Sequence, residues 1–578
     1  MLELRRLIPY LGRYKKRLGA GMVCLLFGKM ASVLAPQVLR MTVDDLTVSV
    51  TKEKLVFYCA LIIGIALVDG FFRFWMRRLI IGVSRYVEAD LRNDFFAHLQ
   101  RMSLPFFHRW RTGDLMSRAT NDIAAVRMVL GPGVMYPVET VVITIAALGF
   151  MLAINVELTL VSLGIMPFVS IAVKKFGAVI HKRFEAIQAK MSDITALVQE
   201  NLSGVRVVKA YTQEASEQEK FEEENQHYFR HNVGLAKIWG AFYPLLAVLI
   251  GIGSALVLWW GGRMVISREI TLGQLVAFFA YLSMLTWPMI AFGWVVNIFQ
   301  RGAASMKRLA VILDESPELT DASDARTDVD LTGGIEFRGV HFQYNGTPVL
   351  RDINLVIEPG KTVAVVGRTG SGKSTLVSLV PRLYDVNEGQ VLVNGVDVRK
   401  LPLARLREAI GFVPQEGFLF SESLRANISF GDDEALLEEV KRVTEVAGLA
   451  DDIADFPKGY DTMVGERGIT LSGGQRQRST IARALLTDPR VLVLDDALSS
   501  VDTETEERIL TQLRGVIRNR TTLLVSHRIS TIKDADLIVV LDEGRIAERG
   551  THQSLVALDG IYASLYRKQL LEDELERI

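Results

Sequence analysis

The residues of this chain best suited to chemistry form a glycine-rich loop and, far downstream, an acidic pair. The loop reads Gly367-Arg368-Thr369-Gly370-Ser371-Gly372-Lys373-Ser374 and follows the short apolar stretch 363–366. Such a loop between a strand and a helix binds phosphate through its backbone N–H groups and the helix N-terminus. We expect Lys373 to reach the β- and γ-phosphates, Ser374 to ligate Mg²⁺, and the helix to begin near Thr375. The loop therefore predicts a nucleotide site.

The acidic pair supplies the second half of such a site. Residues 491–494 read Val-Leu-Val-Leu, which predicts a buried strand, and Asp495 and Asp496 follow directly. Asp495 is placed to hold Mg²⁺, directly or through water, as the carboxylate after such a strand does in P-loop ATPases. The two motifs together predict ATP and Mg²⁺ as the cofactors.

The region around these motifs reads as one α/β domain. From Ile335 onward, short β-branched stretches alternate with helical patterns, so we expect this domain to span 335–578. The segment 313–334 is polar, acidic and without apolar periodicity, and it is interpreted as a linker. Residues 1–312 then form a separate domain.

The composition of that first domain indicates a membrane. The whole chain is 49% apolar yet 23% charged, and its 66 basic and 66 acidic residues cancel, so no global nucleic-acid footprint is present. A membrane-spanning helix needs about 20 apolar residues. Six stretches meet that length, so we predict an all-α domain of six long transmembrane helices at roughly 18–41, 55–80, 129–153, 157–180, 240–262 and 272–298.

The charged connections predict the orientation. The N-terminus and the segment after the second stretch are rich in arginine and lysine, which places both termini and the α/β domain in the cytoplasm of a multi-pass inner (plasma) membrane protein. The connections 81–128 and 181–239 are long and helical in pattern, so the spans are expected to extend into the cytoplasm. Turn-like segments at 112–122 and 201–211 are the expected tips.

Charges also occur inside the spans. Asp69 and Arg73 lie one helical turn apart in the second stretch, where they could pair along one face. Ionisable residues in a membrane span are candidates for function. A structural pair and a substrate contact are both open interpretations.

A third motif, Leu-Ser-Gly-Gly-Gln at 471–475, narrows the class of nucleotide-binding domain that these motifs indicate. Together with the phosphate loop and the acidic pair it resembles the ABC ATPases. With six preceding spans, the whole chain resembles an ABC exporter half-transporter of the multidrug or lipid type. The resemblance implies a dimer that binds ATP between two subunits.

The resemblance also implies roles for residues outside the phosphate loop. Tyr344 matches the aromatic residue that stacks on adenine, and Gln415 the glutamine that senses Mg²⁺ and the membrane domain. His527 matches the switch histidine, Asp502 the loop between the two sites, and Glu466 the exporter segment beside the cytoplasmic tips. The signature residues would contact the γ-phosphate held by the opposite subunit: Ser472, Gly473, Gly474 and Gln475.

Asp496 departs from the family pattern, which has glutamate as the base at this position. Aspartate is shorter by one methylene, about 1.5 Å, and a general base must lie within hydrogen-bond reach of its proton. Hydrolysis at this loop is therefore expected to be slow, with Asp496, His527 and Gln415 as the catalytic candidates. This combination resembles the weak-site chain of a heterodimeric exporter, although a homodimer that tolerates aspartate is also open.

We interpret the chain as an ATPase that drives export of hydrophobic or amphipathic compounds, drugs or lipids, by alternating access. The alternative is a regulatory ABC membrane protein that is gated by ATP and hydrolyses little. The substrate and the partner subunit are not identified by any motif.

Overall fold

The computed structural model describes residues 2–49, 51–164, 166–331, 333–465, 471–499, 501, 503–518 and 520–576. The chain divides into two compact units, 1–100 with 112–315, and 101–111 with 316–578. Each unit is described by itself.

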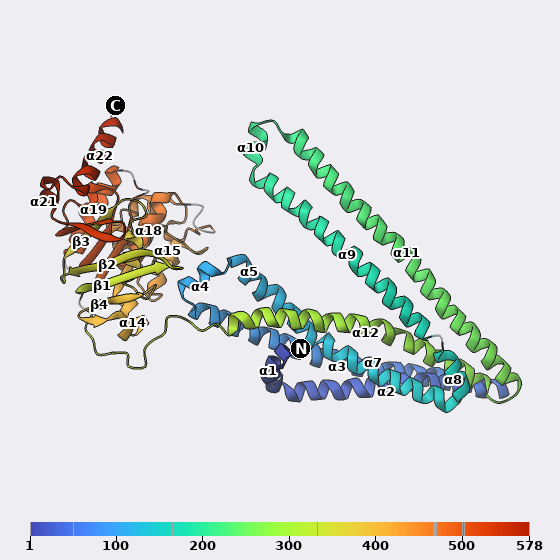
Figure 1. Cartoon of the computed structure of the whole chain (residues 1–578). Helices are drawn as coiled ribbons and strands as arrows, with labels where there is room; N and C mark the ends of the chain where they lie inside the picture. Colours follow the sequence, from blue (N-terminus) through green and yellow to red (C-terminus); the bar gives the residue numbers. More distant parts are fainter. Residues whose placement is uncertain are drawn as a thin grey trace. The chain divides into compact units, whose positions relative to one another are not determined.

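Long helices make up the first unit (Figure 1). It contains η1 (Leu2–Leu7), α1 (Ile8–Arg13), α2 (Lys15–Val48), α3 (Lys52–Gln100 of Lys52–Arg101), α5 (Thr112–Ser117), a π-helical turn (Arg118–Asp122), α6 (Ile123–Leu130), α7 (Pro132–Ile154), α8 (Val156–Leu163), α9 (Met166–Ser203), α10 (Val205–Ala210), α11 (Glu214–Ile266) and α12 (Leu272–Leu313). Local sequence sets several of these ends. Before α12, for example, Thr271 and Gln274 form a capping box, in which each side chain accepts a hydrogen bond from the other residue's backbone N–H.

Five helical stretches among the described residues are long and apolar enough to cross a membrane: Lys15–Val48, Lys52–Arg101, Thr112–Ile154, Val156–Ser203 and Glu214–Ile266. Each contains one of the first five predicted stretches. The sixth, 272–298, lies within α12, where the apolar helix found is the shorter Leu272–Leu285. The sixth span therefore stays a prediction.

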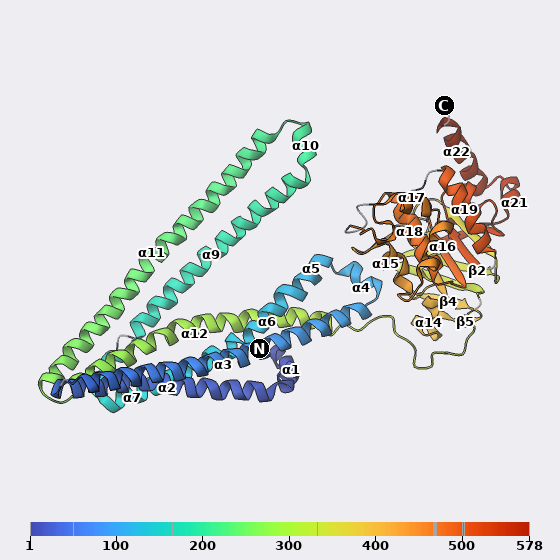
Figure 2. The ribbon, with the colours of Figure 1, turned by 180° about the vertical axis from the view of Figure 1, so that it is seen from behind.

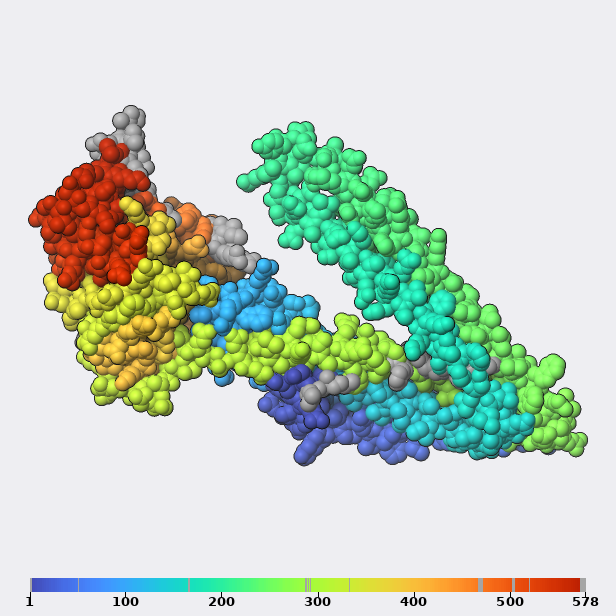
Figure 3. Space-filling model, viewed as in Figure 1, coloured from blue at the N-terminus to red at the C-terminus, as the bar shows by residue number. Residues whose placement is uncertain are grey.

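A packed bundle and a long hairpin are the two parts of this unit. In Figures 1 and 2, α9 and α11 run side by side with α10 at the far end, and in the space-filling view of Figure 3 they form one continuous arm. In the bundle, Leu25 of α2, Met76 and Ile80 of α3 and Met135 of α7 form a buried cluster. Apolar side chains from α2, α3 and α7 thus pack together inside the bundle.

Charged pairs lie beside that apolar cluster. Asp69 and Arg73 form the pair that their spacing allows, with Arg73 Nη2 donating to Asp69 at 2.5 Å. A second pair, not anticipated from the sequence, joins Lys29 of α2 to Glu139 of α7. Both of its side chains are largely buried.

The first chain reversal differs from the expected position. Helix α3 ends at Arg101, α4 (Leu104–Arg109) follows, and the segment 112–122, expected to be a tip, is helical throughout. The reversal therefore occupies 102–111, because Pro105 at the start of α4 begins a new helix there. The second expected tip, 201–211, contains the short helix α10.

The second unit contains α4 together with the α/β domain, so its boundary differs from the expected division at residue 312. Arg109 of α4 pairs with Glu318 at 3.3 Å, and His108 contacts Tyr384. These contacts join 101–111 to the domain that follows. Between α12 and β1, the described residues from 315 to 331 are in neither helix nor strand.

Two sheets form the α/β domain. The antiparallel sheet has the order β2 (Thr347–Ile357), β1 (Ile335–Tyr344), β4 (Glu388–Val393), β5 (Val396–Asp397). The larger sheet has the order β10 (Arg545–Gly550), β9 (Leu537–Asp542), β3 (Thr362–Gly367), β8 (Thr521–Val525), β7 (Val491–Asp495), β6 (Ile410–Val413). Its pairs are parallel except for β10 with β9.

The helices of this domain are short, and they cover the larger sheet. They are α13 (Lys373–Ser378), α14 (Leu403–Glu408), α15 (Leu424–Ile428), α16 (Leu437–Val446), α17 (Ala450–Asp455), α18 (Gly473–Leu486), α19 (Thr503–Ile517), α20 (Ile529–Ile532), α21 (His552–Ala557) and α22 (Ile561–Glu576). Strand β3 is buried on both faces: Val363 and Val365 belong to one apolar cluster, Ala364 and Val366 to the other. This double burial explains the unbroken apolar run before the phosphate loop.

Candidate nucleotide site

The phosphate loop leaves the carboxyl end of β3 and enters α13, as the sequence predicted. The helix begins at Lys373, two residues before the expected Thr375. Arg368, Thr369 and Gly370 are exposed, whereas Ser371, Gly372 and Lys373 are buried. The loop therefore presents residues 368–370 to solvent and anchors residues 371–373 in the domain.

Two glycines of the loop are required by geometry. Gly367 has φ +151°, and a Cβ there would lie 2.1 Å from the backbone oxygen of Leu541. Gly372 has φ +100°, and a Cβ would lie 2.8 Å from Leu350 Cδ2. Only glycine adopts such conformations at little cost and lets the backbone approach this closely.

Lys373 lies across the mouth of the loop. Its Nζ donates to the backbone oxygens of Gly367 at 2.9 Å and Arg368 at 3.0 Å. Burial lowers the pKa of Lys373, while the charges of Asp496 and Asp495 act in the opposite direction. The ammonium group is thus held by neutral carbonyls, which is an arrangement that incoming phosphate oxygens can replace.

Ser374 and Asp495 come together at the end of β7. Ser374 Oγ donates to Asp495 Oδ1 at 3.0 Å. Burial raises the pKa of Asp495, and the neighbouring Asp496 raises it further, against the hydrogen bond from Ser374 and the charge of Lys373. A cation placed here would favour the ionised carboxylate.

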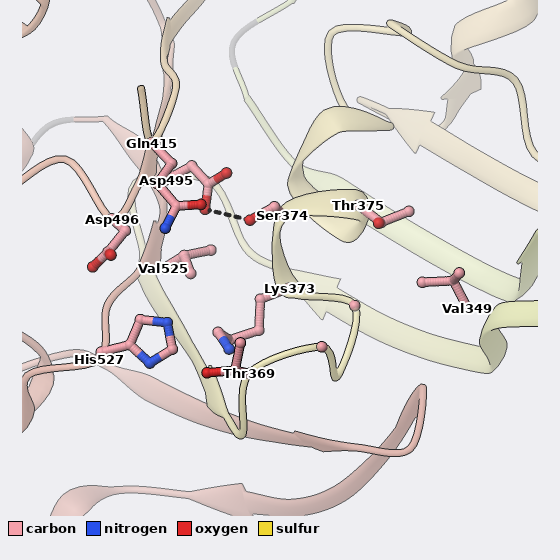
Figure 4. A pocket seen from close by; sticks show the side chains of 12 residues that line it. Val349, Thr369, Lys373, Ser374, Thr375, Gln415, Asp495, Asp496, Val525 and His527 are labelled. Carbon is pink, nitrogen blue, oxygen red and sulfur yellow. Dashed lines mark hydrogen bonds between the residues drawn. The ribbon is translucent and has the colours of Figure 1, made fainter. Parts of the chain in front are cut away.

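These residues line one pocket of about 290 Å³ (Figure 4). Gln415, which follows β6, and His527, which follows β8, line it as well. Parallel strands bring their carboxyl ends to the same sheet edge, which explains how four separated sequence segments meet here. The pocket is lined by Val349, Thr369, Gly370, Gly372, Lys373, Ser374, Thr375, Gln415, Asp495, Asp496, Val525 and His527.

Asp496 has an unusual backbone conformation. Its φ is +48°, in the left-handed region that aspartate and asparagine tolerate better than most residues. Its N–H donates to Val525 O at 2.9 Å, and the residue is only 8% exposed. The turn after β7 is therefore pinned to β8, and the short side chain has little freedom to advance into the pocket.

The signature residues are ordered at the start of α18. Ser472 Oγ accepts from Gln475 N at 3.1 Å, while Gln475 Oε1 accepts from Ser472 N at 3.0 Å. Gln475 Nε2 also donates to Asp452 at 2.8 Å, and Arg478 donates to the other oxygen of Asp452 at 2.7 Å. Gly473 and Gly474 form the first turn of the helix. None of the four signature residues is among those that line the pocket.

Tyr344 ends β1 near the phosphate loop. Its hydroxyl lies 3.4 Å from Thr375 Oγ1, and its ring is edge-on to Phe342 and Tyr384. The side chain is 37% exposed, so one part of the ring is open to a stacking partner. Burial raises the pKa of Tyr384 to about 12, which keeps that hydroxyl protonated.

Two predicted residues, Asp502 and Glu466, lie outside the residues that the structure describes. Sequence reasoning in turn missed Asp452, which orients the signature glutamine, and Tyr384, which packs on Tyr344. Val349 and Val525 line the pocket but carry no polar signal. The sequence does not indicate the role of Asp452, because it lies some 20 residues before the signature and only the fold brings α17 beside α18.

The residues present fit ATP with Mg²⁺. The Ser371 hydroxyl is buried without a hydrogen-bond partner inside the loop, and the glycine backbone leaves room that a Cβ would fill. Hydroxyl, carboxylate and amide oxygens are ligands that Mg²⁺ accepts, and Mg²⁺ binds mostly through one or two such groups plus substrate phosphates. Ser374, Asp495 and Gln415 supply that set beside the loop.

Two protein families match this chain. The family described as "ABC transporter transmembrane region" matches residues 18–289, and the family described as "ABC transporter" matches residues 350–499. The first match lies within the predicted membrane domain, 1–312, and the second within the predicted α/β domain, 335–578.

Three curated relatives match nearly the whole chain. A probable multidrug resistance ABC transporter ATP-binding/permease protein, YheI of Bacillus subtilis (strain 168), is 38% identical and covers 98% of each chain. The multidrug resistance-like ATP-binding protein MdlA of Escherichia coli (strain K12) is 38% identical over 97% of this chain and 96% of its own. An ATP-dependent lipid A-core flippase of Syntrophus aciditrophicus (strain SB) is 37% identical over 99% and 95%.

A solved structure has the same fold. The structure of a bacterial Atm1-family ABC exporter with ATP bound matches with a TM-score of 0.78 and 29% sequence identity. The match covers 96% of this chain and 98% of that one.

Proposed function

The chain belongs to the ABC exporters in which a membrane region is fused to one ATPase domain, and on that basis we propose that it exports hydrophobic or amphipathic compounds as half of a dimer. It is an ATPase coupled to transport. Relatives that carry multidrug or lipid A-core names support drugs or lipids as the substrate class.

The observation that carries this proposal is the divided nucleotide site. The pocket contains the phosphate loop, Gln415, Asp495, Asp496 and His527, whereas the ordered signature at the start of α18 does not line it. A second subunit, placed head to tail, would supply its own signature to this loop. ATP would then be enclosed by residues of both chains.

Within this chain each group has a distinct task. Lys373 would exchange its two carbonyl partners for the β- and γ-phosphates, and Tyr344 would stack on the base. Ser374, Asp495 and Gln415 would hold Mg²⁺, which neutralises charge on the phosphates when bound. His527 lines the pocket beside Asp496 and would orient the attacking water.

Alternating access follows from differential affinity. ATP can close two ATPase domains only if it binds the closed pair better than the open one, and a site shared between subunits meets that condition. The cytoplasmic segments α4 and α10 would pass this closure to the spanning helices. We place six spans in the cell's plasma membrane, with both termini and the ATPase domain in the cytoplasm, since the basic connections lie on that side.

We favour a heterodimer over a homodimer because of Asp496. Its carboxylate is set back by about one methylene and its turn is pinned to Val525, so the water at this loop would be poorly polarised. A partner half-transporter with glutamate at the matching position would provide the competent site, completed by the signature of this chain.

Mg-ATP turnover by the full chain alone in lipid nanodiscs tests the partner, with Lys373→Ala as the blank. Turnover at the blank level, in protein that binds ATP, supports a heterodimer. Rapid turnover that is lost on Asp496→Ala contradicts it and supports a homodimer.

Export is tested separately in proteoliposomes. The chain, alone or with its partner half-transporter, should drive ATP-dependent movement of a hydrophobic dye or of a fluorescent phospholipid. Nucleotide-gated conformational change without movement of either probe would contradict export and favour the regulatory alternative.

A further inference from the structure

Three aromatic side chains form a cluster around Tyr344, the residue expected to stack on the base of the nucleotide and here called the base platform. Phe342 and Tyr344 project from β1, and Tyr384 lies in the segment between α13 and β4. Tyr384 is edge-on to both neighbours, with ring centroids 5.6 Å from Phe342 and 5.5 Å from Tyr344. Edge-to-face packing of this kind is favourable and restrains the orientation of the rings.

Helix α4 contacts this cluster through His108, which packs on Tyr384. His108 Nε2 and the Tyr384 hydroxyl are joined by a hydrogen bond of 3.0 Å, and the two rings stack at 6.5 Å with planes 22° apart. The neighbouring Arg109 pairs instead with Glu318 at 3.3 Å. Through His108, α4 is thus linked to Tyr384 and so to Tyr344, whereas the pair of Arg109 with Glu318 lies elsewhere.

These contacts link His108 of α4 to the ring of Tyr344 through Tyr384. Tyr344 is partly exposed, and its hydroxyl lies 3.4 Å from Thr375 Oγ1 and also interacts with the Tyr384 hydroxyl. Its ring packs against both Phe342 and Tyr384, and of these two only Tyr384 carries a hydroxyl that can be held by His108. The phosphate loop is held by independent contacts, those of Lys373 with Gly367 and Arg368.

We propose that His108 and Tyr384 are positioning residues for the base platform, so that α4 sets the affinity of the site for the base of the nucleotide and leaves its affinity for phosphate unchanged. This rests on the proposed function, in which ATP binds at this loop with Tyr344 against its base. By linkage, a bound base strengthens the contact of α4 with Tyr384 to the same extent. A nucleotide whose base stacks on Tyr344 therefore strengthens the contact between α4 and Tyr384, whereas a phosphate chain without a base does not.

The test is equilibrium binding to the full chain in nanodiscs, with ATP and inorganic tripolyphosphate each competing against a fluorescent ATP analogue. The variants are His108→Phe and Tyr384→Phe, which keep the rings and remove the hydrogen bond. Each should raise the Kd for ATP about threefold to tenfold, the usual worth of one hydrogen bond, and leave the Kd for tripolyphosphate unchanged. The double variant should be no weaker than the single ones, because both remove the same contact.

Two further variants separate positioning from general damage. His108→Gln keeps a group that can bond to the tyrosine hydroxyl and should restore most of the ATP affinity. Arg109→Ala removes the pair with Glu318 and should not change the ratio of the two Kd values. Equal weakening toward ATP and tripolyphosphate, additive effects in the double variant, or unchanged ATP affinity would each overturn the proposal.

The binding readout is separate from export. A chain that binds ATP with this base-specific dependence but moves no substrate contradicts the proposed export and supports the role of His108. A chain that exports, with no base-specific loss in either phenylalanine variant, contradicts only the role of His108.

Discussion

Ser374 donates a hydrogen bond of 3.0 Å to Asp495, which joins the phosphate loop directly to the last residue of β7. The two expected Mg²⁺ ligands are therefore in contact with each other before any nucleotide enters. The contact supplies a buried carboxylate with a hydrogen-bond donor. It also means that the two motifs depend on each other energetically.

We expect Asp495→Asn to stabilise the nucleotide-free chain while it reduces function. Burial raises the pKa of Asp495 above that of an unfolded aspartate, so the folded chain binds the proton more tightly. Stability therefore falls as pH rises through the interval between the unfolded and the folded pKa values of Asp495, and the full cost is present above the folded value. Asparagine removes that cost, so the melting temperature at pH 7 should rise, by about 2–4 °C per kcal/mol. The affinity of the chain for Mg-ATP should fall at least tenfold, about the effect of losing a metal partner.

Ser374→Ala is the matched control for Asp495→Asn. It leaves the carboxylate charged and removes its hydrogen bond, so the melting temperature should fall instead of rise. Thermal unfolding of both variants in the same nanodiscs checks the two signs, and equal shifts would contradict the assignment of the cost to the buried charge.

The second prediction concerns the length of the side chain at position 496. Asp496→Glu should raise Mg-ATP turnover by the chain alone at least about tenfold, because general-base catalysis contributes about 10²–10⁴ when the base reaches its proton. The φ of +48° disfavours glutamate, at a cost of about 1 kcal/mol in stability. Steady-state turnover and thermal unfolding measure the two effects.

Asp496→Asn tests the same idea from the other side. Asparagine tolerates the left-handed conformation and lacks a basic carboxylate. If aspartate is a poor base here, turnover should change less than about threefold, which is small beside the range for an effective base. A loss of a hundredfold would show that Asp496 is the working base.

The third prediction compares two glycines of the phosphate loop. Gly367→Ala places a Cβ 2.1 Å from Leu541 O, whereas a Cβ at Gly370 meets nothing within 4 Å. Both positions have positive φ, so each alanine has the backbone cost of about 1–2 kcal/mol. Only Gly367→Ala must also displace β9, so its melting temperature should be the lower of the two. Equal destabilisation would mean that the loop relaxes away from Leu541.

The glycine and lysine pattern of the phosphate loop was enough to predict its place between β3 and α13, because phosphate binding demands local backbone geometry. The meeting of Gln415, Asp495 and His527 was expected from the family resemblance, and parallel strand order explains it. Asp452 and Tyr384 could not be found in this way, since their contacts with Gln475 and Tyr344 depend on packing between distant segments. The reversal at 102–111 was misplaced because a polar segment, 112–122, continues as helix.

Lys29 and Glu139 show the same limit in the membrane domain. Each has only uncharged residues for a full turn on either side in its own stretch, while Asp69 and Arg73 attracted notice because their spacing alone pairs them on one helix. Lys29 and Glu139 belong to α2 and α7, so their pairing becomes visible only when the helices are packed. Lys29 is one turn beyond Leu25, and Glu139 is one turn beyond Met135, both in the buried cluster of the bundle.

We therefore expect this ion pair to fix the packing of α2 against α7. Lys29→Met leaves the Glu139 carboxylate buried without its partner, which costs about 3–5 kcal/mol in such settings. The double variant Lys29→Met with Glu139→Gln removes both charges and should recover most of that loss, and so should the exchange Lys29→Glu with Glu139→Lys. Thermal unfolding of the membrane domain in nanodiscs measures each step of this cycle. If the single variant is as stable as the parent chain, or if the double variant is as weak as the single one, the pair does not hold the two helices together.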